Sequence, residues 1–73
     1  MERCDIRALE DLAAAIKARR RELKVTQKTL AAFTDLSHNG ISRIEVADSD
    51  VKLSTLLKMA KVLGFKLVLE FES

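Results

Sequence analysis

The sequence predicts a small, mainly α-helical domain of four helices followed by one C-terminal β-strand. Apolar residues recur at helical spacing through most of the 73 residues, proline is absent, and glycine occurs only twice. The last nine residues, FKLVLEFES, instead alternate between apolar and polar side chains, which is typical of a half-buried strand. A single domain spanning 1–73 is therefore expected, with an N-terminal arm at 1–6 and the strand in 64–73.

The first helix is expected from about residue 7 to residue 23, with Asp5 as its cap. Its inward stripe has one charged member, Arg20. The apolar members of that stripe are Leu9, Leu12, Ala13, Ile16 and Leu23.

Two short helices follow. Thr26 is placed to cap QKTLAAFT, and Ser37 is placed to cap HNGISRIEV. The side chains expected to face the core from these two helices are Leu30, Ala31, either Phe33 or Thr34, Ile41, Ile44 and Val46.

A fourth helix is predicted over residues 53–63, after the polar loop ADSDVK. Gly64 has the position of a helix-ending glycine that releases the chain into the strand. The expected inward stripe of this helix is Leu53, Leu56, Leu57, Ala60 and Leu63, with Met59 partly buried.

Composition excludes several classes of protein. With 48% hydrophobic and 33% charged residues, the chain has the balance of a globular protein. Its apolar runs are too short to cross a bilayer, and the single cysteine, Cys4, fits a reducing cytosol. No nucleophile with a base, carboxylate pair or glycine-rich phosphate loop indicates an enzyme, and no cofactor is expected. A metal site at His38 is disfavoured because no Cys/His cluster accompanies it.

The positive charge is concentrated in one segment. Residues 17–28 hold six Lys and Arg residues against Glu22 alone, although the whole chain carries only +2. A local excess of this kind is expected of a nucleic-acid-binding protein.

Two short helices joined by a tight turn, the second of them polar, make a helix-turn-helix. The segment IKARRRELKVTQKTLAAFTDLSHNGISRIE resembles the Cro/repressor-type (Xre) helix-turn-helix, and the resemblance continues through LSTLLKMAKVLG. It implies a four-helix Cro/repressor-like domain. Asp35 stands where the family usually has a turn glycine, so a left-handed backbone is expected there. Lys24 also replaces a common glycine.

The resemblance implies that the second helix of the motif enters the major groove of DNA. Gln27 would dock on a phosphate, and Lys28 would add electrostatic affinity. Arg20 and Glu45 would form a structural ion pair and not contact DNA. The residues carried over to the DNA-facing side of the recognition helix are Ser37, His38, Asn39, Ser42 and Arg43.

The C-terminal strand needs a partner, because backbone N–H and C=O groups must be hydrogen-bonded. The simplest partner is the same strand of a second copy, antiparallel across a two-fold axis. Such a homodimer would place two recognition helices on a palindromic operator. The residues assigned to dimerisation are Phe65, Leu67, Val68, Leu69 and Phe71.

A helix-turn-helix closed by a terminal strand, here LGFKLVLEF, resembles the HipB-like antitoxins of HipBA-type toxin–antitoxin systems. The resemblance implies a cytoplasmic bacterial repressor, nucleoid-associated when DNA-bound, that regulates its own operon. It also implies binding to a HipA-like serine/threonine kinase toxin, with a third subunit where the operon is tripartite. The alternatives are a stand-alone Xre-type regulator of phage or metabolic genes, and an interaction module without DNA binding.

Overall fold

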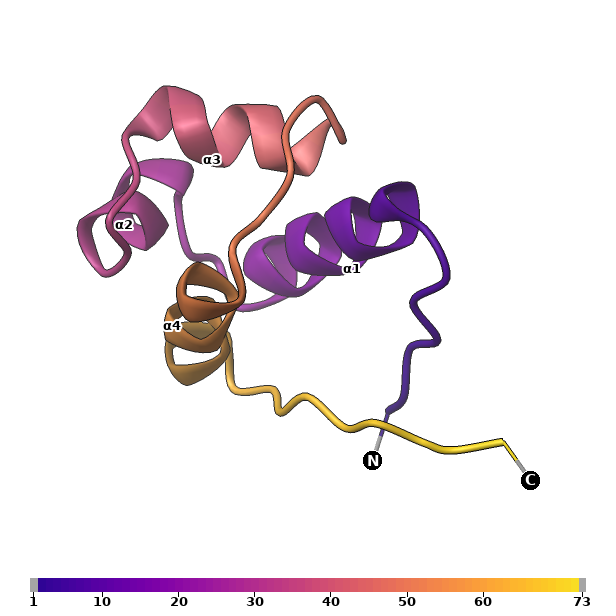
Figure 1. Cartoon of the computed structure of the whole chain (residues 1–73). Coiled ribbons are helices and arrows are strands. Elements are labelled where there is room, and N and C mark those ends of the chain that lie inside the picture. The colour runs from indigo at the N-terminus through magenta and orange to yellow at the C-terminus, as the bar shows by residue number, and fades with distance from the viewer. Residues whose placement is uncertain (1, 73) are drawn as a thin grey trace.

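The computed structural model describes residues 2–72 and contains the four predicted helices in the predicted order (Figure 1). They are α1 (Leu9–Glu22), α2 (Gln27–Ala32), α3 (His38–Glu45) and α4 (Leu53–Leu63). Helix α3 contacts both α1 and α2. Met1 and Ser73, the outer ends of the predicted arm and strand, lie outside the described residues. No helix within residues 2–72 is long and apolar enough to span a membrane.

Local hydrogen bonds explain where the helices begin. Thr26 and Ser37 cap α2 and α3 as predicted, accepting from the backbone N–H of Thr29 and Gly40 at 3.0 and 3.1 Å. The prediction that Asp5 caps α1 is wrong. The Asp11 carboxylate instead accepts from the backbone N–H groups of residues 7 and 8, so α1 begins only at residue 9.

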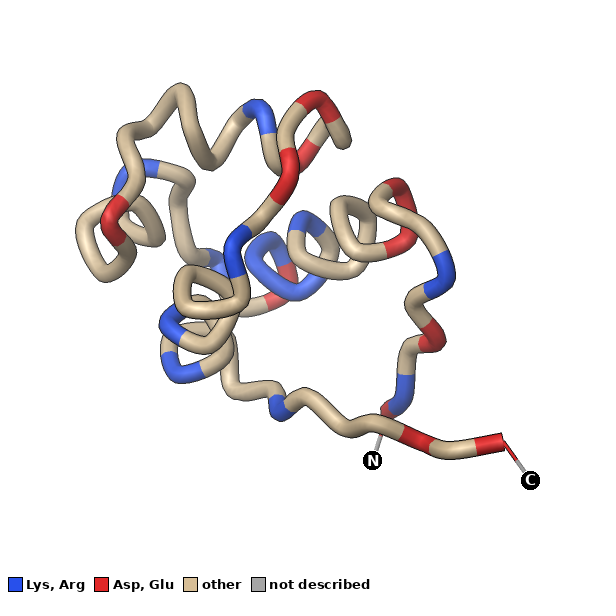
Figure 2. The backbone as a smooth tube through the Cα atoms, viewed as in Figure 1, with Lys and Arg blue, Asp and Glu red and all other residues tan. Residues whose placement is uncertain are grey.

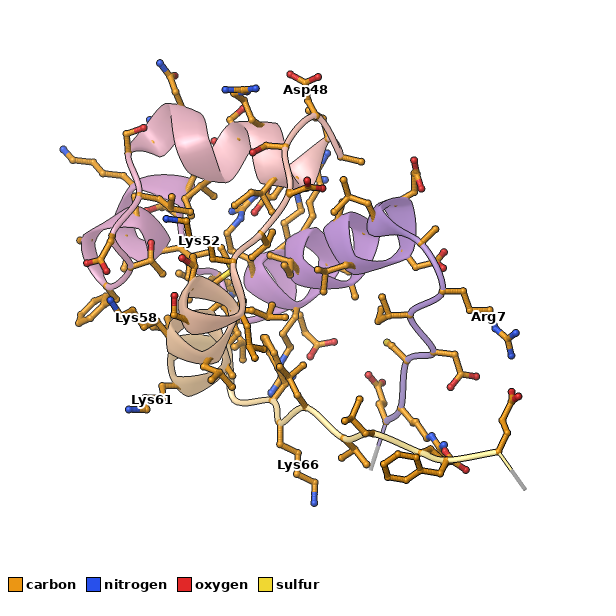
Figure 3. All side chains as sticks on the ribbon, in the orientation of Figure 1. Arg7, Asp48, Lys52, Lys58, Lys61 and Lys66 are labelled. Atoms are coloured by element: carbon orange, nitrogen blue, oxygen red, sulfur yellow. The ribbon has the colours of Figure 1, made fainter. Side chains whose placement is uncertain are left out.

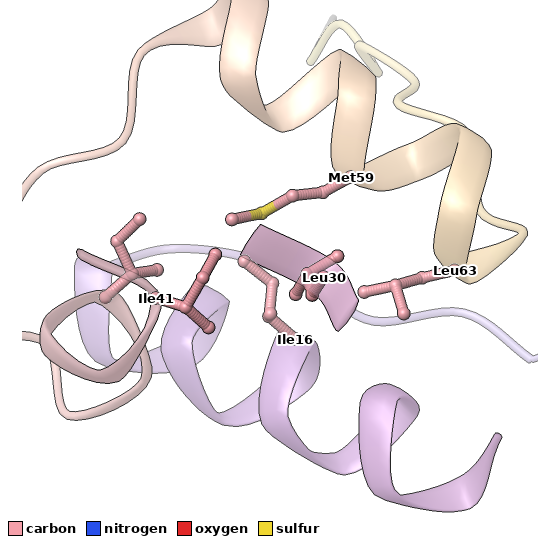
Figure 4. Packing of buried hydrophobic residues seen from close by; sticks show 6 residues of the cluster. Ile16, Leu30, Ile41, Met59 and Leu63 are labelled. Atoms are coloured by element: carbon pink, nitrogen blue, oxygen red, sulfur yellow. The ribbon is translucent and has the colours of Figure 1, made fainter. Parts of the chain in front are cut away.

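The core lies where α1, α2, α3 and α4 meet (Figure 4). Each helix contributes at least one side chain that is almost completely removed from solvent, which makes the four helices one packing unit. These side chains are Ile16, Leu30, Ile41, Ile44, Met59 and Leu63.

Several predicted core positions are wrong. On α4, Met59 is completely buried, whereas Leu53 and Leu57 are 64% and 48% exposed. The apolar surface of α4 is wider than the face that this chain covers. Of the two alternatives at the end of α2, Thr34 is the buried one and Phe33 is exposed, because the Thr34 hydroxyl can donate to the carbonyl oxygen of Leu30 at 3.1 Å.

Leu23 and Val46 are also exposed, contrary to prediction. Each is the residue at which a helix ends, so the backbone turns its side chain away from the helical stripe.

The turn between α2 and α3 forms without a left-handed residue. Within residues 2–72, positive φ angles occur only at Lys24, Ala47 and Gly64, so the expectation for Asp35 is wrong. The N–H groups of residues 33 and 34 instead bond the carbonyl oxygens of residues 30 and 31, and the turn closes with right-handed geometry. The Asp35 carboxylate pairs with Lys58 of α4.

Residues 65–72 leave α4 as a segment that forms no strand within the described chain (Figure 1). Phe65 packs against the core, while Leu67, Leu69 and Phe71 are 43%, 84% and 88% exposed. An ion pair joins Glu70 to the N-terminal arm through Arg3. The predicted strand pairing is between two copies, so it stays a prediction.

Candidate nucleic-acid interface

Helix α3 presents one polar face to solvent, because its opposite face is anchored in the core by Ile41 and Ile44. Gly40 permits close packing at its first turn, since a Cβ atom there would lie 3.3 Å from Cβ of Leu36. Among the predicted DNA-facing residues, Ser42 is half-buried and the others are exposed, namely Ser37, His38, Asn39 and Arg43.

Arg43 has an intramolecular partner that the sequence did not indicate. Its Nε atom lies 3.4 Å from an Asp48 carboxylate oxygen, and its Nη2 donates to the Asp48 carbonyl at 3.3 Å. Asp48 lies in the loop just after α3 (Figure 3). Both side chains are mostly exposed, and such pairs contribute little to stability. Arg43 can therefore exchange this contact for a phosphate or a base.

Lys and Arg residues gather where α1 ends and α2 begins (Figure 2). A surface hollow there, here called the basic hollow, extends to the first residue of α3. It is lined by Arg20, Arg21, Thr26, Gln27, Lys28 and His38. Its cations give this end of the motif a positive potential that attracts phosphate.

Arg19 belongs to the segment of positive charge but has another task. Its Nε donates to the Leu63 carbonyl oxygen at 2.8 Å, and its guanidinium pairs with Glu22. It thereby satisfies a carbonyl group at the end of α4, which is otherwise left unpaired in a helix.

Arg20 and Glu45 form a bidentate ion pair beneath the interface. Nε and Nη2 of Arg20 donate to the two Glu45 carboxylate oxygens at 2.6 and 3.0 Å, and Nη1 donates to the Val25 carbonyl at 2.8 Å. The two residues are 9% and 5% exposed. The contacts join the end of α1 to the end of α3 and to the segment before α2.

The environment of this pair favours the charged forms of both groups. Burial raises the pKa of Glu45, but hydrogen bonds from Arg20 and Gln27 and the nearby positive charges outweigh it, so the pKa is lowered overall. The hydrogen bond to Glu45 raises the pKa of Arg20 despite desolvation.

Gln27 links this pair to the exposed face of α3. Its Nε2 donates to Oε1 of Glu45 at 3.1 Å, and its Oε1 lies 2.8 Å from Nε2 of His38. Sequence reasoning placed Gln27 on a phosphate and missed both contacts. Gln27 lies on α2, 18 residues before Glu45 and 11 before His38 on α3, and periodicity within one helix does not predict contacts between two helices. One amide N–H of Gln27 remains for a phosphate.

The lowered pKa of Glu45 predicts an acid-sensitive fold. The unfolded carboxyl has a pKa of about 4.3, so the stabilisation is complete above that pH and is lost as pH falls through the lower folded value. Urea unfolding followed by circular dichroism should therefore show a steep loss of stability below about pH 4. Glu45→Gln should be less stable at neutral pH but lose less stability on acidification. Equal losses in the two proteins would contradict this assignment.

Comparisons with known proteins agree with the geometry. A family model described as Helix-turn-helix matches residues 16–69. A HipB variant in complex with an O2 20mer is 25% identical, with a TM-score of 0.81, covering 99% of this chain and 100% of its own. HipB in an O4 20mer complex and in a HipA-HipB-O2-O3 complex is 26% identical, with a TM-score of 0.78, covering 94% of this chain and 97% of each of theirs. No curated protein sequence matches the chain.

Proposed function

Because this chain belongs to the helix-turn-helix family and is a HipB-like DNA-binding regulator, we propose that it is a repressor that binds its operator as a homodimer. The observation that carries the proposal is the polar outward face of α3 beside the basic hollow. Asn39 has the amide chemistry to pair with adenine, and Arg43 can reach guanine or a phosphate. Lys28 supplies a phosphate contact next to them.

The homodimer part of the proposal rests on the C-terminal segment. Leu67, Val68, Leu69 and Phe71 expose apolar surface, while the backbone of 65–72 has no ladder partner in the described chain. An antiparallel pair of these segments would satisfy the backbone and cover the apolar side chains. Two-fold symmetry then gives two α3 helices for the two halves of a palindrome.

We further propose that the protein is the antitoxin of a HipA-like serine/threonine kinase toxin and regulates the operon that encodes both. The likeness to HipB in a complex that also contains HipA supports this. The rival is a stand-alone Xre-type regulator. A kinase-like gene next to its own would separate the two, because on co-expression only an antitoxin should co-purify with that kinase and suppress its toxicity, either alone or with a third subunit.

DNA binding is tested by fluorescence anisotropy, with the DNA upstream of the protein's own gene as probe. A scrambled duplex of equal length and composition is the control. Saturation at two chains per site with a clear preference for the upstream DNA is expected. Equal, salt-sensitive binding to both duplexes would leave only electrostatic attraction and would contradict sequence-specific repression.

Removing a base contact should weaken specific binding without affecting assembly. Asn39→Ala and Arg43→Ala should each cost about 1–3 kcal/mol of specific binding free energy, while light scattering still shows a dimer. Lys61→Ala is the matched control, since it also removes an exposed side chain with one positive charge but lies away from α3 (Figure 3). Equal losses in Lys61→Ala and Arg43→Ala would show that only net charge matters.

A further inference from the structure

The contacts of Gln27 determine which way its amide points. Glu45 is ionised, because both of its oxygens accept hydrogen bonds from the Arg20 guanidinium, and an ionised carboxylate can only accept hydrogen bonds. It accepts from Arg20 at one oxygen, and Oε1 accepts from both Arg20 and Gln27. The Gln27 side chain must therefore turn its NH₂ group inward and its carbonyl oxygen toward α3.

The orientation of Gln27 in turn determines the chemistry of His38. The Gln27 oxygen can only accept, so Nε2 of His38, 2.8 Å away, must carry a hydrogen. A neutral imidazole has a single N–H, and its other nitrogen accepts. Nδ1 is thus left as a bare acceptor on an exposed side chain at the first residue of α3.

Within residues 2–72, the contact with Gln27 is the one hydrogen bond made by the His38 ring. Arg20, Arg21 and Lys28 only donate hydrogen bonds, so none of them can hold a hydrogen on Nδ1. The Thr26 hydroxyl is engaged with the Thr29 hydroxyl at 2.9 Å.

We propose that the Arg20–Glu45 pair, acting through Gln27, fixes His38 as the Nε2–H tautomer and makes it a specificity-determining residue that accepts a hydrogen bond from a base. The inference rests on the proposed DNA-binding function. In the major groove only adenine N6 and cytosine N4 offer an amino group, whereas guanine N7 and O6 and thymine O4 accept. His38 therefore selects adenine or cytosine at its contact, and Gln27 is a positioning residue.

The tautomer can be measured without DNA. His38 is the only histidine in the chain, so long-range ¹H–¹⁵N NMR of labelled protein at pH 8 assigns its ring nitrogens unambiguously. Hydrogen is expected on Nε2 alone, with slow solvent exchange. Gln27→Met should give a mixture of tautomers with fast exchange, whereas Lys28→Met, the neighbouring control, should not. Hydrogen on Nδ1 in the wild type would overturn the proposal. A wild-type tautomer mixture equal to that of Gln27→Met would also overturn it, and neither outcome requires that the variant folds.

The base contact is tested with modified operators in the anisotropy assay. Each adenine is replaced in turn by purine and each cytosine by pyrimidin-2-one, which removes the amino group alone. The replacement at the His38 contact should weaken binding of the wild type about fivefold but leave binding of His38→Ala unaffected, whereas a replacement at an Asn39 contact should weaken both. If His38→Ala instead couples only to 7-deazaguanine, which lacks the N7 acceptor, His38 donates and the proposal is wrong.

The two tests separate this inference from the proposed function. Specific operator binding together with a mixture of His38 tautomers would contradict the inference but agree with the proposed repressor function. Absence of specific binding would remove the proposed function and with it the base contact, while the NMR result would still decide how Gln27 orients His38.

Discussion

Replacing Arg20 with methionine is expected to lower the free energy of unfolding by about 3–5 kcal/mol, because it leaves the buried Glu45 carboxylate without its charged partner. Glu45 is only 5% exposed, so water cannot take the place of the lost guanidinium. Within residues 2–72, Gln27 would be its one remaining side-chain donor. The Val25 carbonyl would also lose the bond from Nη1.

The double variant Arg20→Met, Glu45→Leu distinguishes a lost attraction from an orphaned charge. Replacing both partners of a buried pair with apolar side chains is often neutral or stabilising, so the double variant should recover most of the loss. Arg21→Met, an exposed neighbour, should change stability by no more than about 0.5 kcal/mol. Urea unfolding at one fixed protein concentration, near 15 °C, measures all four proteins. A double variant as unstable as Arg20→Met would show that the pair itself carries the stability.

Local signals in the sequence predicted the helices well. Periodicity placed all four, and the C-terminal end of α4 was placed correctly because Gly64 adopts the left-handed conformation that terminates it. The caps Thr26 and Ser37 act on groups three residues away, so they too could be predicted. Asp35 could not, because two backbone hydrogen bonds and the Thr34 hydroxyl replace the left-handed turn residue.

Prediction of which side chains are buried was less complete, for a physical reason. Periodicity identifies an apolar stripe but not how much of that stripe a single chain covers. On α4 the covered face is centred on Met59, and Leu53 and Leu57 remain outside it. The alternating residues of the C-terminal segment likewise predict a strand, but residues 2–72 contain no partner strand for it.

The sequence also predicted only part of the candidate site. The outward positions of α3 follow from helical geometry once Ile41 and Ile44 are assigned to the core. The contacts of Gln27 do not, because they join the start of α2 to both ends of α3. Only the three-dimensional structure shows that the residue expected on a phosphate connects the buried ion pair to His38.

The C-terminal segment predicts the second large effect. Leu67→Lys with Leu69→Lys should convert the proposed homodimer into monomers. Fully burying a leucine stabilises by about 1.5–3 kcal/mol, and a symmetric dimer would bury four of these side chains. Because Leu67 and Leu69 are 43% and 84% exposed in one chain, the lower end gives about 4 kcal/mol for the two copies, or roughly three orders of magnitude in the dimer Kd. Light scattering over a concentration series measures this directly.

The variants should also separate assembly from folding. The core residues of all four helices precede the substituted positions, so helical circular dichroism should be retained by the monomer. Glu70→Lys with Glu72→Lys is the control, because it places two lysines on the alternate face of the same segment and changes the net charge even more. This control should stay dimeric. If the double variant Leu67→Lys, Leu69→Lys were also dimeric by light scattering, the C-terminal segment would not be the dimer interface. Another surface would then have to place the two α3 helices on the two halves of the palindrome. The exposed Leu53 and Leu57 of α4 would then be the next positions to change.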